Sequence, residues 1–534
     1  MVGDLIRLKL TIQRHTHSWK RLLGLVSGLL AAAGTWAIVF VAEPAARTDV
    51  LLLVLAAWTA GWIVGPVLTS GAAMLRPEYF TLLPLRRRTL GTGLLASAFV
   101  GVGGAVTAIA SLALIAYALV SADDSTAIAA AVTGLIGAKL LLVFVVALSR
   151  AVYALLGAAM RTNLGVELAA VQYGLLLSSM TAGWAVVRPV LSSLPVFLRD
   201  GFGTIPARAA LEWTPFGLPV RAVDAMAAGR PWSAVGSIAL LAAVTAVVTL
   251  AAIALLTPHV GDRTARRRRR PWGSRALTRA RLLPASPLGA VVGKELRTWW
   301  RDPWRSLEVR SAIWFGVFIA VYAAIAGVPE IAGLAGVAVA LTVALSGANL
   351  FGQDGTALWQ LVVAESRESV RADIRGRQIG ITVLFGLPAF VLCVAMMAVT
   401  GIFDYVVPIL ATLTALLGVG CGTAVVMSVL GATPGVDPHK RVNATDAGEN
   451  TVGIFAAFQI QLWATAPTTG MAAALAFAGA SLPSWFGAAT LAVAVVNAFA
   501  GAWLGGALAT RRLATHLPET FAKLRYPVRT EKAA

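Results

Sequence analysis

Long apolar segments recur along the whole chain, and they constrain its fold more than any other feature. Twelve of them approach or exceed the length of about 20 residues that a helix needs to cross a bilayer. Because lipid offers no partners to backbone polar groups, we expect helices rather than open strands. The predicted fold is therefore all-α and polytopic, with about 12 transmembrane helices. The expected spans are 22–42, 50–73, 90–119, 126–148, 164–187, 232–257, 311–327, 331–351, 379–400, 406–430, 453–475 and 484–510.

The composition excludes several other classes of protein. The 534 residues are 58% hydrophobic and only 13% charged, whereas soluble domains carry about 25% charged residues. An ordinary soluble enzyme, a disordered protein and a nucleic-acid-binding domain are thus disfavoured. Cys393 and Cys421 lie in apolar segments, and the five histidines have no metal-ligand spacing. We expect neither a disulfide scaffold nor a metal site.

Basic residues are distributed unevenly between the two sets of loops and ends. Of the 44 Lys and Arg, 37 lie in the set that contains both termini and the central linker. Basic loops stay on the cytoplasmic side of a membrane. We therefore expect a multi-pass protein with both termini in the cytoplasm.

Two stretches of the chain repeat one another, which predicts a duplication. Residues 163–183 and 450–470 share identical residues at several ungapped positions, including Asn163 with Asn450 and Gln172 with Gln459. Each stretch opens the fifth predicted span of its half. Six spans per half give both halves the same orientation, with a symmetry axis along the membrane normal. The expected parts are a first half at 1–257, a basic linker at 258–285, a second half at 286–510 and a tail at 511–534.

The linker contains nine arginines within residues 263–281. No aromatic platform or folded module accompanies them, so nucleic acid is not an expected partner. We interpret the run as a solvated segment that fixes topology and contacts anionic membrane lipids.

Each half opens with a basic amphipathic segment, 4–22 and 286–310, which we call the elbow segments. Such helices lie in the membrane interface rather than cross it. In the second one, tryptophans suit the headgroup boundary and basic residues, Arg305 among them, suit anionic lipid. The candidate elbow residues are Lys294, Glu295, Trp299, Trp300 and Arg301. The alternative is a plain membrane anchor.

The loop after the second span of each half mixes apolar, aromatic and charged residues. These segments are 75–91 and 352–380. A loop that needed only solubility would not place apolar side chains so densely. A short helix that docks on a cytosolic partner would do so, and a helix on the inner leaflet is the alternative.

These features together resemble the permease subunit of type-two ABC exporters, the class that includes drug and antibiotic exporters of actinobacteria. The resemblance is carried by KELRTWWRDPWR, EYFTLLPLRRRTLGTGLL, DGTALWQLVVAESRESVRADIRGRQIG and PFGLPVRAVDAMAAGRPW. It implies an elbow helix before span one, a coupling helix after span two and short outer helices between spans five and six. It also implies that the membrane is the bacterial cell membrane. Here the outer helices fall in 188–231, and the second half has only a few residues at that place.

The resemblance also implies the partners and the residues that contact them. Two copies of a separate ATP-binding cassette subunit would bind ATP and Mg, since this chain has no phosphate-binding G-x-x-x-x-G-K-[ST] motif and needs no cofactor of its own. The function expected is ATP-driven export of a lipophilic or amphipathic small molecule. The implied ATPase-coupling residues are Glu78, Tyr79, Arg86, Arg87, Arg88, Trp359, Glu365, Arg367 and Arg371.

A secondary, ion-coupled efflux transporter is the rival interpretation, because that class also has six plus six spans. Residues 75–91 do not match its usual G-x-x-x-D-R-x-G-R-[RK] signature. Acidic residues within spans would be expected for proton coupling, and only Glu167 comes close. A membrane enzyme is disfavoured because no acid, base and nucleophile converge, so no catalytic residue is predicted.

Four polar residues in or near the predicted spans are candidates for the solute path. Lys139 is the one charge deep in a span and could line a path, pair across helices or reach an interface. Gln172, Gln459 and Gln461 could face a seam between the halves, or form ordinary hydrogen bonds between helices.

Overall fold

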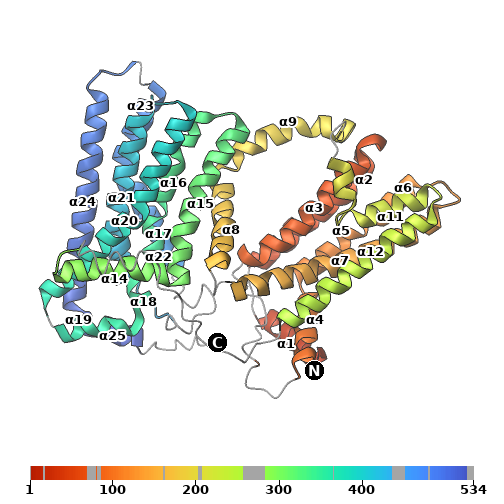
Figure 1. The fold of residues 1–534 in the computed structure, drawn as a ribbon, viewed down its shortest axis with the longest axis horizontal. Helices are drawn as coiled ribbons and strands as arrows, with labels where there is room; N and C mark the ends of the chain where they lie inside the picture. The colour runs from red at the N-terminus through yellow and green to blue at the C-terminus, as the bar shows by residue number, and fades with distance from the viewer. Residues whose placement is uncertain are drawn as a thin grey trace. The chain divides into compact units, whose positions relative to one another are not determined.

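The computed structural model describes residues 2–15, 19–68, 80, 86–159, 163–202, 207–256, 283–364, 366–435, 451–478 and 481–525. All regular structure in these ranges is helical (Figure 1). Within these ranges, ten helical segments are long and apolar enough to cross a membrane. The chain is thus an all-α, multi-pass membrane protein. The ten segments are Leu22–Val41, Pro44–Gly65, Val102–Ser121, Ala127–Leu155, Pro231–Leu255, Pro303–Ala326, Pro329–Ser346, Arg367–Thr400, Val406–Leu430 and Phe486–Thr515.

The fifth and eleventh predicted spans take a different form from these ten. At the fifth, α8 (Asn163–Ala182) and α9 (Trp184–Asp200) meet at a bend of 68°. At the eleventh, α22 (Thr451–Ala464) and α23 (Ala466–Ala478) are two shorter apolar helices. The two stretches that repeat in sequence are both helical, and the repeat itself stays a prediction.

The chain packs as two compact units. Unit 1 contains residues 1–158 and 190–264, and unit 2 contains residues 159–189 and 265–534. These units do not follow the two halves of the sequence, because α8 from the first half belongs to unit 2.

Unit 1 is built from apolar helices around a buried core. Its helices are α1 (Val2–His15), α2 (Trp19–Val41), α3 (Pro44–Leu68), α4 (Arg87–Ala98), α5 (Val102–Ser111), α6 (Ala113–Ser121), α7 (Ala127–Ala159), α10 (Ala207–Glu212), α11 (Leu218–Ala227) and α12 (Pro231–Leu255). Leu51, Leu114 and Val220 are fully buried together in its core. Helix α11 lies in the predicted outer segment. Its Asp224 accepts from the hydroxyl of Tyr117 on α6, and the same hydroxyl pairs with Thr48 of α3 at 2.7 Å, so that α11 is joined to α3 and α6.

Unit 2 contains α8 together with the helices of the second half of the chain. They are α14 (Pro287–Arg301), α15 (Pro303–Ala326), η2 (Pro329–Leu334), α16 (Ala335–Leu341), α17 (Val343–Ser346), α18 (Leu350–Asp354), η3 (Gly355–Leu358), α19 (Trp359–Ala364), α20 (Arg367–Thr400), α21 (Val406–Leu430), α22, α23, α24 (Phe486–Thr515) and α25 (Leu517–Arg525). In Figure 1, α14 lies crosswise to α20 and α24 near one end of them, with α18, α19 and α25 at the same end.

Glycines bring α21 and α24 into close contact. Each helix carries a G-x-x-x-G pattern, Gly418 with Gly422 and Gly501 with Gly505. A Cβ at Gly422 would lie 2.1 Å from the carbonyl oxygen of Gly501. Small residues allow such backbone approach between membrane helices, where close packing replaces the hydrophobic effect as the source of attraction.

The boundary between α14 and α15 follows directly from the sequence RDPW. Asp302 caps α15, and its Oδ1 accepts from the backbone N–H of Trp304 at 3.0 Å. Pro303 occupies the first turn, where its missing N–H costs nothing. Ser286 caps α14 in the same way ahead of Pro287. The elbow helix therefore turns sharply into the first span of the second half.

Candidate functional site: a buried ion network at the second elbow helix

Six charged side chains from four helices of unit 2 form one ion network, in which all the side chains except that of the half-buried Lys294 are buried. The helices are the elbow helix α14, the start of α15, the end of α18 and the start of α20. The network thus joins the predicted elbow to both ends of the predicted coupling segment. We call these residues the elbow network: Lys294, Glu295, Arg305, Asp354, Asp373 and Arg377.

Asp354 is the point where most of the ion pairs converge. One of its carboxylate oxygens accepts from Arg305 at 2.6 Å, and the other accepts from Arg377 at 2.6 Å. Lys294 donates to the same carboxylate. Burial alone would raise the pKa of Asp354, but Arg377, Arg305 and Lys294 hold that pKa well below its ordinary value. Asp354 is therefore charged at any physiological pH.

Glu295 supplies the second anionic centre of the network. Its carboxylate is fully buried and lies 3.2 Å from Arg305 and 3.3 Å from Arg377. Trp299, one turn further along α14, donates its indole N–H to Glu295 at 3.2 Å. With Asp373 paired to Arg377 at 2.7 Å, three cations face three anions. This balance is what permits charges to be buried at all.

Glycines allow the elbow helix to approach α20 closely enough for these contacts. A Cβ at Gly376 would lie 2.6 Å from Val291 Cγ1, and one at Gly380 would lie 2.9 Å from Glu295 Cβ. Trp299 and Phe385 pack edge to face next to this contact, with 5.6 Å between ring centroids. The network is therefore held within a tightly packed crossing of two helices.

The predicted coupling segment of the second half is closed into a loop by the Asp354–Arg377 pair. Inside the loop, Leu358, Val370 and Ile374 are buried in an apolar cluster with α21, α24 and α25. On its outside, Trp359 is 51% exposed and Val363 is 69% exposed. α19 thus has an inner apolar face that is packed and an outer one that is not.

The other predicted coupling residues are placed as follows. Arg367 and Arg371 are exposed on the first turns of α20, and Arg86 and Arg88 are exposed at the start of α4. Arg87 begins α4. Glu78, Tyr79 and Glu365 lie outside the described residues.

The five predicted elbow residues divide into two groups. Lys294 and Glu295 belong to the elbow network and Trp299 contacts it, whereas Trp300 and Arg301 are exposed. Arg305, which was expected to contact lipid, is 1% exposed and pairs with carboxylates. That expectation was wrong because Glu295 and Asp354 offer Arg305 a better partner than a headgroup.

The first elbow helix makes a mostly apolar contact with α4. Leu5, Leu90 and Leu94 are buried together there. Lys9 is nearly buried as well and donates to the carbonyl oxygen of Ser97 at 2.6 Å. Burial, assisted by the nearby charge of Arg150, lowers the pKa of Lys9 to about 8.

The predicted solute-path residues lie on three helices, α7 of unit 1 and α8 and α22 of unit 2. Lys139 is exposed on α7, and Gln172 and Gln459 are half-buried on α8 and α22. Gln461 is fully buried, and its amide donates to the carbonyl oxygens of Ala340 at 3.0 Å and Leu416 at 3.1 Å. Gln461 therefore joins α22 to α16 and α21 rather than facing an opening.

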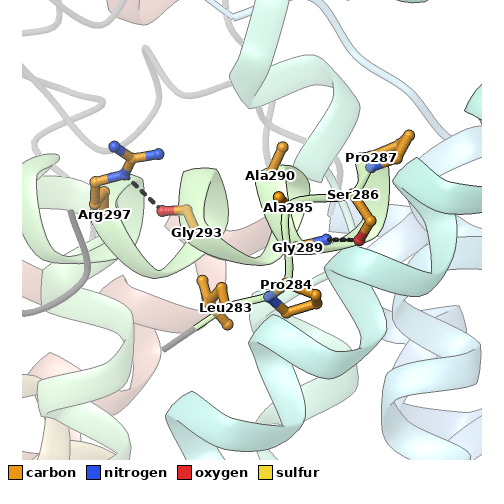
Figure 2. Close-up of a pocket in the computed structure, with 9 residues that line it drawn as sticks. All are labelled: Leu283, Pro284, Ala285, Ser286, Pro287, Gly289, Ala290, Gly293 and Arg297. Carbon is orange, nitrogen blue, oxygen red and sulfur yellow. Dashed lines mark hydrogen bonds between the residues drawn. The ribbon is translucent and has the colours of Figure 1, made fainter. Parts of the chain in front are cut away.

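A shallow hollow lies at the start of α14 (Figure 2). Ser286 accepts from the Gly289 N–H there at 3.2 Å, and Arg297 donates to the Gly293 carbonyl at 2.8 Å. Its lining is mostly small and apolar, so its polar groups serve the helix itself. Among the described residues, no group of three His, Cys, Asp or Glu side chains is placed to hold a metal ion.

Asp354, Asp373 and Arg377 lie within the predicted coupling segment, but no sequence motif predicts a role for them. One signal could have found part of the network, because Asp373 and Arg377 are spaced i,i+4 just before a predicted span. Only the tertiary structure shows that these residues meet α14 and α18.

No family model, curated protein or solved structure matches this chain.

Proposed function

We propose that the chain is the membrane-spanning permease subunit of an ATP-driven ABC exporter of the bacterial cell membrane. In this proposal it has twelve spans in two like-oriented halves, both termini are cytoplasmic, and two ATP-binding cassette subunits dock on it. Those subunits supply ATP binding with Mg and hydrolysis. The cargo is a lipophilic or amphipathic small molecule.

The observation that carries this proposal is the elbow network. A segment that passes on the motion of an ATPase must be fastened to the helices it moves. Asp354 and Arg377 fasten both ends of the second coupling segment to each other, and Glu295 and Arg305 fasten them to the elbow helix and to α15. A loop that merely connected two spans would need no such anchorage.

The outer face of α19 supports a docking role. Trp359 and Val363 leave apolar surface exposed next to Arg367 and Arg371 of α20. Exposed aromatic anchors with a charged rim are typical of protein interfaces. In the proposed mechanism, ATP draws the two cassette subunits together, and the coupling segments move the helices through the network. Access to a site between the halves then alternates between the two sides of the membrane.

The test is to examine whether the adjacent reading frame encodes an ATP-binding cassette subunit and to express that subunit together with this chain. We expect a complex with two cassette subunits per chain that hydrolyses ATP, and no hydrolysis by the chain alone. Arg367→Glu combined with Arg371→Glu should lower the amount of bound subunit by about tenfold, the loss expected when an interface contact worth about 1.4 kcal/mol is removed. Insertion should stay normal.

Arg199→Glu is the matched control, because Arg199 is also an exposed arginine but lies in the predicted outer segment, where it pairs with Asp200. Its complex should match the wild type. Dependence of transport on a proton gradient, with no cassette subunit bound, would overturn the proposal and favour an ion-coupled efflux transporter.

A further inference from the structure

The last helix among the described residues, α25, packs against the coupling segment of unit 2. α24 ends at Thr515 and α25 begins at Leu517. Leu517 and Leu524 are buried in the same apolar cluster as Leu358 of η3. Figure 1 shows α25 beside α19 at the end of unit 2 where α14 also lies. α25 is therefore packed against the segment that we propose as the docking site.

The apolar face of α25 is already occupied. Phe521 packs against the same cluster, which also includes Leu361 and Val362 of α19. The opposite face consists of exposed residues such as Glu519, Ala522 and Lys523. An amphipathic helix that rests on lipid would need its apolar face free. The contact of α25 is instead with its own protein.

The short length of α19 explains why such support is needed. A helix of six residues does not form by itself, because nucleation costs more than one turn of hydrogen bonds returns. The elbow network fixes the two ends of the coupling segment, and α25 covers its inner apolar side. With both in place, Trp359 and Val363 are left facing outward.

We infer that α25 is a positioning element for the docking helix α19, so that engagement of the ATP-binding cassette subunit depends on the C-terminal helix of this chain. The inference rests on the proposed function. It adds a second route for motion, from the coupling segment through α25 into the last span α24. The elbow network serves the first and third spans of the second half.

The test compares a charge placed on either face of α25. Leu524→Asp puts a carboxylate into the buried contact, whereas Ala522→Asp puts the same group on the exposed face. Leu524→Met keeps an apolar side chain of similar volume. We expect Leu524→Asp to insert normally but to lower the co-purified cassette subunit and its ATP hydrolysis by about tenfold. Ala522→Asp and Leu524→Met should match the wild type.

Cysteine labelling gives a readout that does not involve the partner. A cysteine introduced at Val362 should react slowly with a water-soluble maleimide in the wild-type background and at least severalfold faster with Leu524→Asp. A chain ended at His516 repeats the comparison without a buried carboxylate, and a chain ended at Arg525 is its control.

The two hypotheses fail in different ways. If Leu524→Asp or the chain ended at His516 binds the cassette subunit and supports hydrolysis like the wild type, α25 is not a positioning element and the proposed function stands. If the wild-type chain binds no cassette subunit, the proposed function fails and this inference fails with it.

Discussion

At the scale of single residues, the two elbow helices make their main contacts through different kinds of side chain. The first, α1, packs against α4, and the second, α14, packs against α20. Leu5, Leu90 and Leu94 make the contact in unit 1, whereas Glu295 and Arg377 lie at the contact in unit 2. Replacing buried ion pairs by apolar residues is often neutral or stabilising. The charges of unit 2 are therefore not explained by stability, and the geometry that they impose on the coupling segment is the better reason for them.

Lys9 gives a prediction about pH at this scale. Because its pKa is about 8 in the folded protein and about 10.4 in an unfolded chain, both states hold the proton below pH 8. Between these values the unfolded state binds more protons, so stability rises with pH. We expect the wild type to gain up to about 2 kcal/mol relative to Lys9→Met from pH 8 to pH 10.5, after allowance for solvent screening.

Thermal unfolding in detergent at a series of pH values measures this difference. Lys523→Met, at an exposed lysine, controls for the loss of a basic residue. A constant gap between wild type and Lys9→Met across that pH range would show that Lys9 titrates normally.

At the scale of elements, α8 and α15 illustrate how one glycine sets a helix contact. A Cβ at Gly174 would lie 2.5 Å from Trp314 Cβ and 2.8 Å from the backbone nitrogen of Phe315. Nearer the start of α8, Glu167 accepts from Arg310 at 2.7 Å and from the indole N–H of Trp314 at 2.6 Å. The ion pair fixes the register, and the glycine permits the approach.

Gly174→Ala should therefore destabilise the protein by about 1–3 kcal/mol, since backbone atoms must shift to admit the methyl group. Gly61→Ala is the matched control, because open space surrounds a Cβ at Gly61 in α3. There the better helix propensity of alanine should stabilise by about 0.5–1 kcal/mol. Midpoints of thermal unfolding measure both changes, and equal midpoints for the two variants would contradict the packing described.

At the scale of the whole molecule, the sequence halves and the packing units do not coincide. α8 comes from the first half of the sequence, but it packs in unit 2 through Gly174, Glu167 and the pair of Ser179 with Tyr322 at 2.6 Å. Because unit 2 contains a helix from the first half of the sequence, the packing of unit 2 depends on that half as well as on the second.

The corresponding prediction concerns a divided chain. Fragments 1–272 and 273–534, expressed together, should co-purify in detergent because α8 of the first fragment completes unit 2. Gly174→Ala in the first fragment should reduce the recovered first fragment severalfold, and Gly61→Ala should not. Recovery of the second fragment alone, at full yield and stability, would show that α8 is dispensable for unit 2.

The apolar segments made most of the fold predictable. Ten of the twelve predicted spans correspond to helices long enough to cross a membrane, and the elbow helix α14 begins at a serine cap and ends just before Asp302 and Pro303. The bend between α8 and α9 was not predicted, because apolar composition continues through it. At the candidate site, the sequence indicated the elbow and coupling segments but not the partners within them.

Sequence alone determined that this chain is helical and multi-pass. The length and apolarity of each segment are local properties, and they decide by themselves whether the segment can cross a bilayer as a helix. Only the tertiary structure decided that Glu295, Asp354 and Arg377 share one buried network and that α8 belongs to unit 2. Both depend on which helices lie side by side, and helix contacts in a membrane are set by small residues and specific polar pairs that leave no periodic signature in the chain.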